Sequence, residues 1–219
     1  MMDSGREKKL FRSGYRLVGA VDEAGIGPLA GPVVAACVTL RPEFFQAKDL
    51  EKTSLDLIKD SKKLTAKRRE QLFVEIKENF FEVGIGMSDC QTIDRINILE
   101  ASFLAMKKAL GALKHKPDFL LLDGRFKIPN LSIGQEAVID GDNLVFSIAA
   151  ASIIAKVARD QIMEAMGEKY PGYGFEVHKG YGTRKHMENL KKLGPCPIHR
   201  RSFAPVREAG LTKGPDLLK

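Results

Sequence analysis

Two adjacent acidic residues, Asp22 and Glu23, end an apolar run and lead directly into a glycine-rich segment, residues 25–32, called the glycine turn below. An ionised carboxylate is costly to remove from water unless it is paired or binds a metal. Glycines permit a tight turn or the close approach of another molecule to the backbone. The stretch 21–34 is therefore a candidate for a chemically active site.

The same arrangement, an apolar segment followed by an acid and a turn, recurs twice later in the chain. Asp123 follows the continuous apolar run 119–122, and Asp142 follows a short strand predicted over 135–140. Because functional side chains gather at the strand ends of α/β sheets, we expect these two acids to meet Asp22 and Glu23. Four converging carboxylates repel one another strongly unless cations lie between them.

Oxygen ligands without a nearby Cys/His set favour Mg²⁺ or Mn²⁺ over zinc. Two such ions, roughly 4 Å apart, can activate water and clamp the attacking and leaving oxygens in phosphodiester hydrolysis. Taken singly, each acid is better explained as a turn or cap residue than as a metal ligand. Taken together, the four favour a metal site.

A second long helix, predicted over 147–166, carries Ser152, Lys156 and Arg159 at positions i, i+4 and i+7, on one face. Such a face can hold a phosphate backbone, but the spacing alone favours a polar outer stripe. Tyr181, between two glycines, could stack on a sugar or base, and an ordinary loop tyrosine fits nearly as well.

Competing motifs fail on their context. Residues 25–30 match the G-x-G-x-x-A dinucleotide pattern, but prolines and a Val/Ala/Thr run follow where that motif must open a helix. The sequence contains no Gly-Lys-Ser/Thr of a P-loop. Cys196 and His199 form one CxxH pair without the second pair that a zinc site needs.

The elements that must position these residues alternate between strands and helices. Thr65 is expected to cap a helix, because its hydroxyl can accept an N–H of the first turn. The strands are predicted over 16–21, 32–40, 80–87, 119–122 and 135–140, the first two as an antiparallel pair, and the helices over 66–79, 92–113, 147–166 and 183–193. This order favours one α/β domain with a mixed sheet.

Composition places the chain among globular proteins and gives it a basic surface. The 219 residues are 44% hydrophobic and 29% charged, with a formal net charge of +7. Three scattered cysteines, a polar start and the lack of an apolar run of about 18 residues predict a cytoplasmic protein with free thiols. Seven Lys/Arg and one acid lie within residues 184–207, which suits either a polyanion or a solvated helix face.

Eight segments in order, spanning about residues 15–207, resemble the ribonuclease HII family, and the ending 199–203 is similar to its bacterial branch. The segments are Asp22–Val33, Asp60–Leu64, Ile93–Leu99, Leu122–Gly124, Gly141–Asp142, Ala151–Asp160, His178–Thr183 and His199–Phe203. The resemblance implies an RNase H-like fold, a mixed sheet flanked by helices with a C-terminal helical extension. It also implies Mg²⁺- or Mn²⁺-dependent endonucleolytic cleavage of RNA in RNA–DNA hybrids. Single ribonucleotides in duplex DNA would be cut on their 5′ side, leaving 3′-hydroxyl and 5′-phosphate ends.

The resemblance also assigns roles to residues of this chain. The residues that match the family's catalytic, metal-binding acids are Asp22, Glu23, Asp123 and Asp142. Those that match substrate-binding positions are Gly25, Ile26, Gly27, Lys62, Ser152, Lys156 and Tyr181. Ile26 departs from the family's usual Gly-Arg-Gly or Gly-Lys-Gly turn, which senses the ribose 2′-hydroxyl. We therefore expect an active enzyme that has lost a cation near the substrate backbone.

The alternative is a non-catalytic nucleic-acid-binding module with turnover impaired by Ile26. The predicted organisation is a flexible tail over 1–14, one catalytic domain over 15–207 whose basic helical part covers about 183–207, and a frayed tail over 208–219. We expect a monomer that binds RNA–DNA hybrid or ribonucleotide-containing duplex, with no membrane contact. Contact with a replication clamp stays open.

Overall fold

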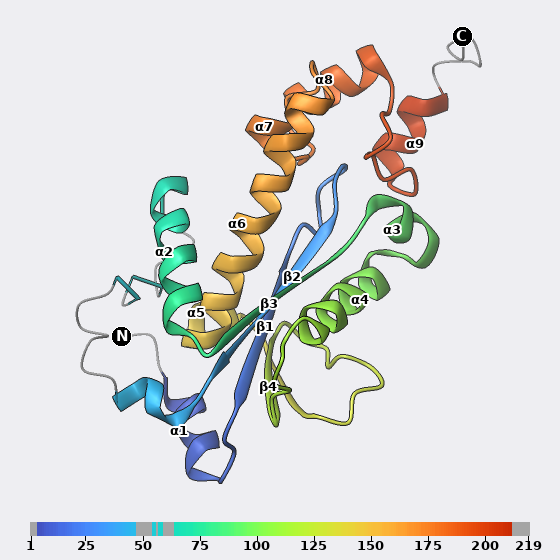
Figure 1. Ribbon diagram of the computed structural model, residues 1–219. Coiled ribbons are helices and arrows are strands. Elements are labelled where there is room, and N and C mark those ends of the chain that lie inside the picture. The colour runs from blue at the N-terminus through green and yellow to red at the C-terminus, as the bar shows by residue number, and fades with distance from the viewer. Residues whose placement is uncertain (1–3, 47–53, 56, 59–63, 212–219) are drawn as a thin grey trace.

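A mixed sheet of five strands forms the centre of the computed structural model, which describes residues 4–46, 54–55, 57–58 and 64–211 (Figure 1). Its strands are β1 (Val18–Ala24), β2 (Val33–Leu40), β3 (Glu82–Ser88), β4 (Phe119–Asp123) and β5 (Gly134–Val138). They lie in the order β3-β2-β1-β4-β5. The pairs β1–β2 and β2–β3 are antiparallel, whereas β1–β4 and β4–β5 are parallel. The predicted mixed sheet and the antiparallel first pair are confirmed.

Helices cover both faces of this sheet. The helix α4 (Ile98–Gly111) packs on one face, and α6 (Phe146–Lys169) with α2 (Ala66–Asn79) packs on the other (Figure 1). Successive side chains of a strand point to opposite faces. In β1, Val18 and Ala20 accordingly join the core under α6, and Val21 joins the core under α4. Every residue of β2 is buried, as a strand covered on both faces requires.

The predicted helix over 92–113 is wrong in one respect, because it is broken at Asn97. The helix α3 (Cys90–Ile96) ends there and α4 begins at the next residue. Asn97 has φ +67°, which asparagine tolerates better than most residues, and its side chain accepts hydrogen bonds from the amides of Leu99 and Glu100 at 3.0 and 3.1 Å. Leu99, just after the break, is 45% exposed, whereas Phe103, Met106 and Leu110 further along α4 are buried.

The first residues do not form the flexible tail that the sequence suggested. Residues 5–12 form the helix α1 (Gly5–Arg12), and Glu7 within it is fully buried. Its carboxylate accepts hydrogen bonds from the backbone N–H and the hydroxyl of Ser147, at 2.9 and 2.7 Å. A carboxylate is stabilised at this position because Ser147 lies in the first turn of α6, where backbone N–H groups are otherwise unpaired.

The C-terminal helices extend the domain beyond the end of the sheet (Figure 1). They are α7 (Phe175–His178), α8 (Arg184–Leu193) and α9 (Ala204–Leu211). Thr183 caps α8 by accepting from the amide of His186 at 3.2 Å, as Thr65 caps α2 by accepting from that of Arg68 at 3.3 Å. Because α9 runs to residue 211, the boundary expected at 207 lies inside a helix.

Two short elements complete the fold, η1 (Pro42–Gln46) and α5 (Gly141–Leu144). The described residues contain no helix with the length and apolar character needed to cross a bilayer.

Candidate active site

The four predicted acids lie close together at the C-terminal ends of the parallel strands β1 and β4. Val21 pairs with Leu122, so Asp22 and Asp123 follow at the same level on neighbouring strands. Glu23 is the next residue of β1 and points to the opposite face from Asp22. Asp142 lies in α5, and its backbone N–H donates to Oδ1 of Asp123 at 3.2 Å.

Burial and mutual repulsion disfavour the ionised forms of these acids. Burial raises the pKa of Asp22 well above its ordinary value, and repulsion from Glu23 and Asp123 raises it further. Burial, followed by repulsion from Asp123, raises the pKa of Glu23 to about 7. The pKa of Asp123 is raised by its burial and by Asp142. A cation placed among the carboxylates would reverse these shifts, because opposite charge favours ionisation.

The donor set fits hard divalent cations that share their ligands with water and substrate. The buried Oε2 of Glu23 has no hydrogen-bond partner among the described residues, although the Ser102 hydroxyl is near enough to lower the pKa of this carboxyl. In the same part of the chain, no three acidic, imidazole or thiol groups are placed to enclose a single ion. Mg²⁺ is commonly held by one or two carboxylates together with waters and phosphate oxygens. The acids therefore suit an open site rather than a closed cage.

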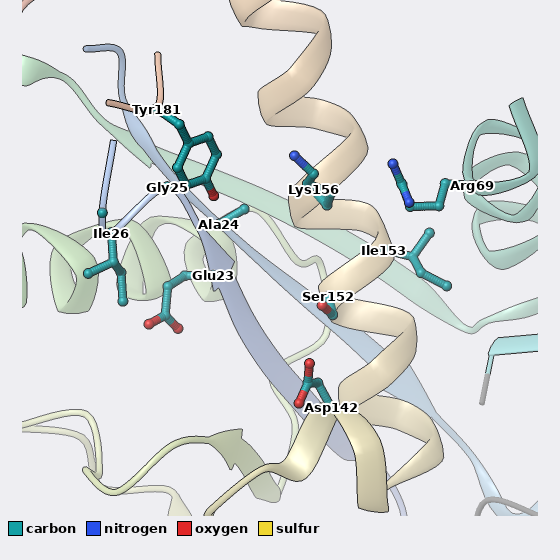
Figure 2. A pocket seen from close by; sticks show the side chains of 11 residues that line it. Glu23, Ala24, Gly25, Ile26, Arg69, Asp142, Ser152, Ile153, Lys156 and Tyr181 are labelled. Carbon is teal, nitrogen blue, oxygen red and sulfur yellow. The ribbon is translucent and has the colours of Figure 1, made fainter. Parts of the chain in front are cut away.

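A pocket of about 480 Å³, the turn pocket, opens beside the acids. It is lined by Glu23, Ala24, Gly25, Ile26, Gly27, Arg69, Asp142, Ser152, Ile153, Lys156 and Tyr181. Figure 2 shows the carboxylates of Glu23 and Asp142 on one side, with the cationic ends of Lys156 and Arg69 on another. Carboxylates and cationic side chains thus line the same cavity.

Tyr181 stands at the edge of the turn pocket, 43% exposed. Its ring centroid lies 5.8 Å from Nζ of Lys156 and 5.7 Å from Cζ of Arg159, within the range of cation–π attraction. Nζ of Lys156 also contacts Oδ1 of Asp160 at 2.8 Å, one helical turn further along α6. The ring is therefore held by two cations while one part of it stays open to the pocket.

Two sequence-level expectations about cations need correction. Arg159 does not extend the polar face of Ser152 and Lys156, because it is fully buried and donates to the carbonyls of Pro32 and Ala30. Arg200, counted among the basic residues of the C-terminal stretch, is also fully buried. Neither guanidinium presents a surface charge to a polyanion. Lys62 lies outside the described residues.

Sequence reasoning missed Arg69, Arg125 and Phe126. Arg69 follows the N-cap Thr65 by four residues and reaches the turn pocket from α2. Arg125 and Phe126 follow Asp123-Gly124 and line a second, more apolar pocket. Glu23 and Ile26 line this pocket too. The signal was present, since Arg69 ends a basic run within a capped helix and Arg125 directly follows a predicted site motif.

Comparison with known proteins places this geometry in a family. The profile of the family Ribonuclease HII matches residues 19–206. The chain belongs to the ribonuclease HII family. Ribonuclease HII of Caldicellulosiruptor bescii is 51% identical over 197 residues, which cover 90% of this chain and 91% of that protein.

Solved structures of ribonucleases HII share the fold. Ribonuclease H2 from Pyrococcus horikoshii OT3 superposes with a TM-score of 0.75 at 27% identity, covering 90% of this chain and 98% of that one. Ribonuclease HII in the PCNA:RNase HII complex from Archaeoglobus fulgidus superposes with a TM-score of 0.68 at 28% identity, covering 84% and 92%. The RNase H-like fold predicted from the sequence is confirmed.

Membership of the ribonuclease HII family makes this chain an enzyme. It is a hydrolase, an endonuclease of the ribonuclease H type that acts on RNA–DNA hybrids. The non-catalytic alternative loses its basis, because all four acids are present and lie together. The dinucleotide interpretation fails too, since the strand β2 follows the glycine turn where a helix would be needed.

Proposed function

We propose that this ribonuclease HII cuts on the 5′ side of ribonucleotides, including single ribonucleotides within duplex DNA, and leaves 3′-hydroxyl and 5′-phosphate ends. Asp22, Glu23, Asp123 and Asp142 are assigned as the ligands of two divalent cations, Mg²⁺ or Mn²⁺. The observation that carries the proposal is the meeting of these acids at the sheet edge beside the turn pocket.

The chemistry divides between the acids and the groups that hold the substrate. Divalent cations supply charge stabilisation for phosphodiester hydrolysis and lower the pKa of water. The raised pKa of Glu23, about 7, means that this carboxyl gives up its proton as it becomes a ligand. On the other side of the pocket, Lys156 and Arg69 are assigned to neutralise phosphates, and Ser152, whose hydroxyl contacts Asp22, is assigned to the same substrate-binding face.

Discrimination of RNA from DNA is assigned to the glycine turn and Tyr181, which share the turn pocket. The ribose 2′-hydroxyl both donates and accepts hydrogen bonds, so exposed backbone groups can recognise it without a charged side chain. An aromatic ring offers a flat surface for the neighbouring sugar or base. Because backbone groups recognise the 2′-hydroxyl and the ring of Tyr181 contacts the sugar or base, the turn can distinguish RNA from DNA although residue 26 is isoleucine.

The proposal includes a monomeric enzyme and a replication-clamp contact. The relative from Archaeoglobus fulgidus was solved in a complex with PCNA, which supports the second point.

The test uses an end-labelled DNA duplex that carries one ribonucleotide, incubated with Mg²⁺, with Mn²⁺ or with EDTA. We expect one nick on the 5′ side of the ribonucleotide with either cation, and none in EDTA. An all-DNA duplex of the same sequence is the control and should stay intact. Cutting of long RNA–DNA hybrids without cutting of this duplex would refute the single-ribonucleotide activity. Nicking in EDTA would refute the metal assignment.

A further inference from the structure

Two fully buried arginines, Arg159 and Arg200, lie against the inner side of the glycine turn. Within the described part of the chain, none of the ion pairs includes either guanidinium. A buried cation without a carboxylate requires other acceptors, because its desolvation is costly. Here the acceptors are backbone carbonyls of the turn.

Arg200 binds three of these carbonyls. Its Nη2 donates to Gly25 O at 2.5 Å, its Nη1 to Ile26 O at 2.8 Å and its Nε to Gly31 O at 3.0 Å. Its backbone N–H donates to Leu29 O at 2.9 Å. Arg200 thus hydrogen-bonds both to the start of the turn, at Gly25 and Ile26, and to its later part, at Leu29 and Gly31.

The position of these carbonyls decides where the adjacent amides point. In a planar trans peptide the C=O and the N–H of the following residue point in opposite directions, and none of the described peptide bonds is cis. Because Arg200 holds the carbonyls of Gly25 and Ile26 on the buried side, the N–H groups of Ile26 and Gly27 point away from it. Both residues are exposed and line the turn pocket, where Figure 2 shows Ile26, whereas Arg200 does not line it. Neither amide has a hydrogen-bond partner among the described residues.

We propose that Arg200 is a positioning residue for substrate recognition, which orients the amides of Ile26 and Gly27 to donate to the ribose 2′-hydroxyl oxygen of the substrate. This inference rests on the proposed function and names the side chain that makes the turn a sensor. It also explains how the turn can work with isoleucine at position 26, since the orienting cation lies beneath the turn rather than within it.

The surroundings of Arg200 support a fixed position for its side chain. The preceding residues join the turn through the amide of Gly31, which donates to Ile198 O at 2.9 Å, and through a bridge between Ala30 and His199. Burial, followed by repulsion from Arg159, lowers the pKa of Arg200 to about 9, so the group stays charged at neutral pH. The C-terminal extension is therefore fastened to the turn through this residue.

The experiment compares Arg200→Lys with the matched control Arg12→Lys, an exposed arginine on α1. Lysine keeps the charge but cannot bridge three carbonyls. Affinities are measured without divalent cations for a duplex with one ribonucleotide, for the same duplex in DNA and for an RNA–DNA hybrid, and thermal unfolding is recorded for each protein. We expect Arg200→Lys to lower the preference for ribose-containing duplexes about tenfold, on the order of one lost hydrogen bond or two. Arg12→Lys should keep the wild-type preference.

Two outcomes would overturn the inference. One is an unchanged preference in folded Arg200→Lys. The other is an equal loss of affinity for all three duplexes, which would indicate a merely structural role. Measuring the three affinities at several salt concentrations identifies the second outcome, because a lost phosphate contact changes the salt dependence of binding to every duplex.

A measurement on the wild-type protein keeps the inference testable if Arg200→Lys fails to fold. The amide resonances of Ile26 and Gly27 should shift when the RNA–DNA hybrid is added, and a lack of any shift would overturn it. If the wild-type protein does not prefer the single-ribonucleotide duplex, the proposed single-ribonucleotide activity fails. The role of Arg200 is then decided by comparing the shifts of these resonances on addition of the hybrid between wild type and Arg200→Lys.

Discussion

The backbone N–H of Asp142 donates to Oδ1 of Asp123, at 3.2 Å, and this hydrogen bond joins α5 to the end of β4. Asp123 therefore has a structural contact as well as a charge. Asparagine at this position keeps an oxygen acceptor for the Asp142 amide and removes only the charge.

Asp123→Asn is expected to fold normally and to lose nicking activity. The amide side chain cannot supply the negative charge that a divalent cation needs, whereas the link to Asp142 persists. The cleavage assay should show a loss of at least about 100-fold, on the scale of removing a principal electrostatic group. A gel-shift measurement should show that the duplex is still bound.

Asp123→Ala provides the contrast, because it removes the acceptor together with the charge. It should lose activity to the same extent and also unfold at a lower temperature. Full cleavage by Asp123→Asn would contradict the assignment of this residue.

Gly25→Ala is expected to destabilise the fold by about 2–4 kcal/mol, the sum of backbone strain and overpacking. Gly25 has φ +99°, and a Cβ there would lie 2.1 Å from Nε of the buried Arg159. Gly27→Ala is the matched control for stability, since a Cβ at that position meets no heavy atom within 4 Å. Urea unfolding measures both changes, and equal stabilities for the two variants would show that the turn can relax around a methyl group.

Local signals account for the parts of the fold that the sequence predicts. The strand Val33–Leu40 follows from an apolar run that only Thr39 interrupts, and Ala66–Asn79 follows from the N-cap Thr65. The meeting of Asp22 with Asp123 follows from the rule that parallel strands end at one edge of a sheet.

The missed features depend on contacts between distant parts of the chain. The sequence predicts a surface position for Arg200. Nothing in it indicates that the carbonyls of Ile26 and Gly25, 174 and 175 residues away, accept hydrogen bonds from this side chain. Glu7 reads as part of a polar tail for the same reason, since its partner Ser147 is 140 residues away. The break at Asn97 is local, but Ile93, Ile96, Leu99 and Phe103 keep a helical spacing across it and conceal it.

Ile26→Arg is expected to tighten binding to a duplex that carries one ribonucleotide. The side chain of Ile26 is 47% exposed and lines the turn pocket, so an arginine there can reach a phosphate without displacing the core. A charged hydrogen bond at a partly exposed position contributes on the order of 1 kcal/mol, or about fivefold in affinity. Fluorescence anisotropy measures the change, with Ile26→Gln as the uncharged control. Unchanged affinity and selectivity would mean that the turn gains nothing from a cation at this position.

The stability of the C-terminal extension should depend on the protonation of His199, which is buried against His186. The Nδ1 atom of His199 accepts from the amide of Cys196 at 3.0 Å, so its Nε2 carries the proton and donates to Nε2 of His186 at 3.1 Å. Nδ1 of His186 then donates to the carbonyl of Tyr181 at 2.9 Å. A further proton on either ring would bring two N–H groups into opposition, and His178, stacked on His186, would add to the repulsion.

Unfolding of wild type and His199→Gln at several pH values tests this dependence. Burial, followed by repulsion from His186, lowers the pKa of His199 to about 4, below its ordinary value of 6.5. The unfolded chain therefore binds the proton first, and the stabilisation is present above pH 6.5 and is lost as the pH falls toward 4. The shift corresponds to about 3 kcal/mol.

The raised pKa values of Asp22 and Glu23 act with the opposite sign, because their ionisation destabilises the fold as the pH rises. The difference between wild type and His199→Gln removes that contribution. We expect this difference to shrink by about 3 kcal/mol as the pH falls from 7.5 to 4. A difference that does not change with pH would show that His199 is protonated equally in the folded and unfolded chains.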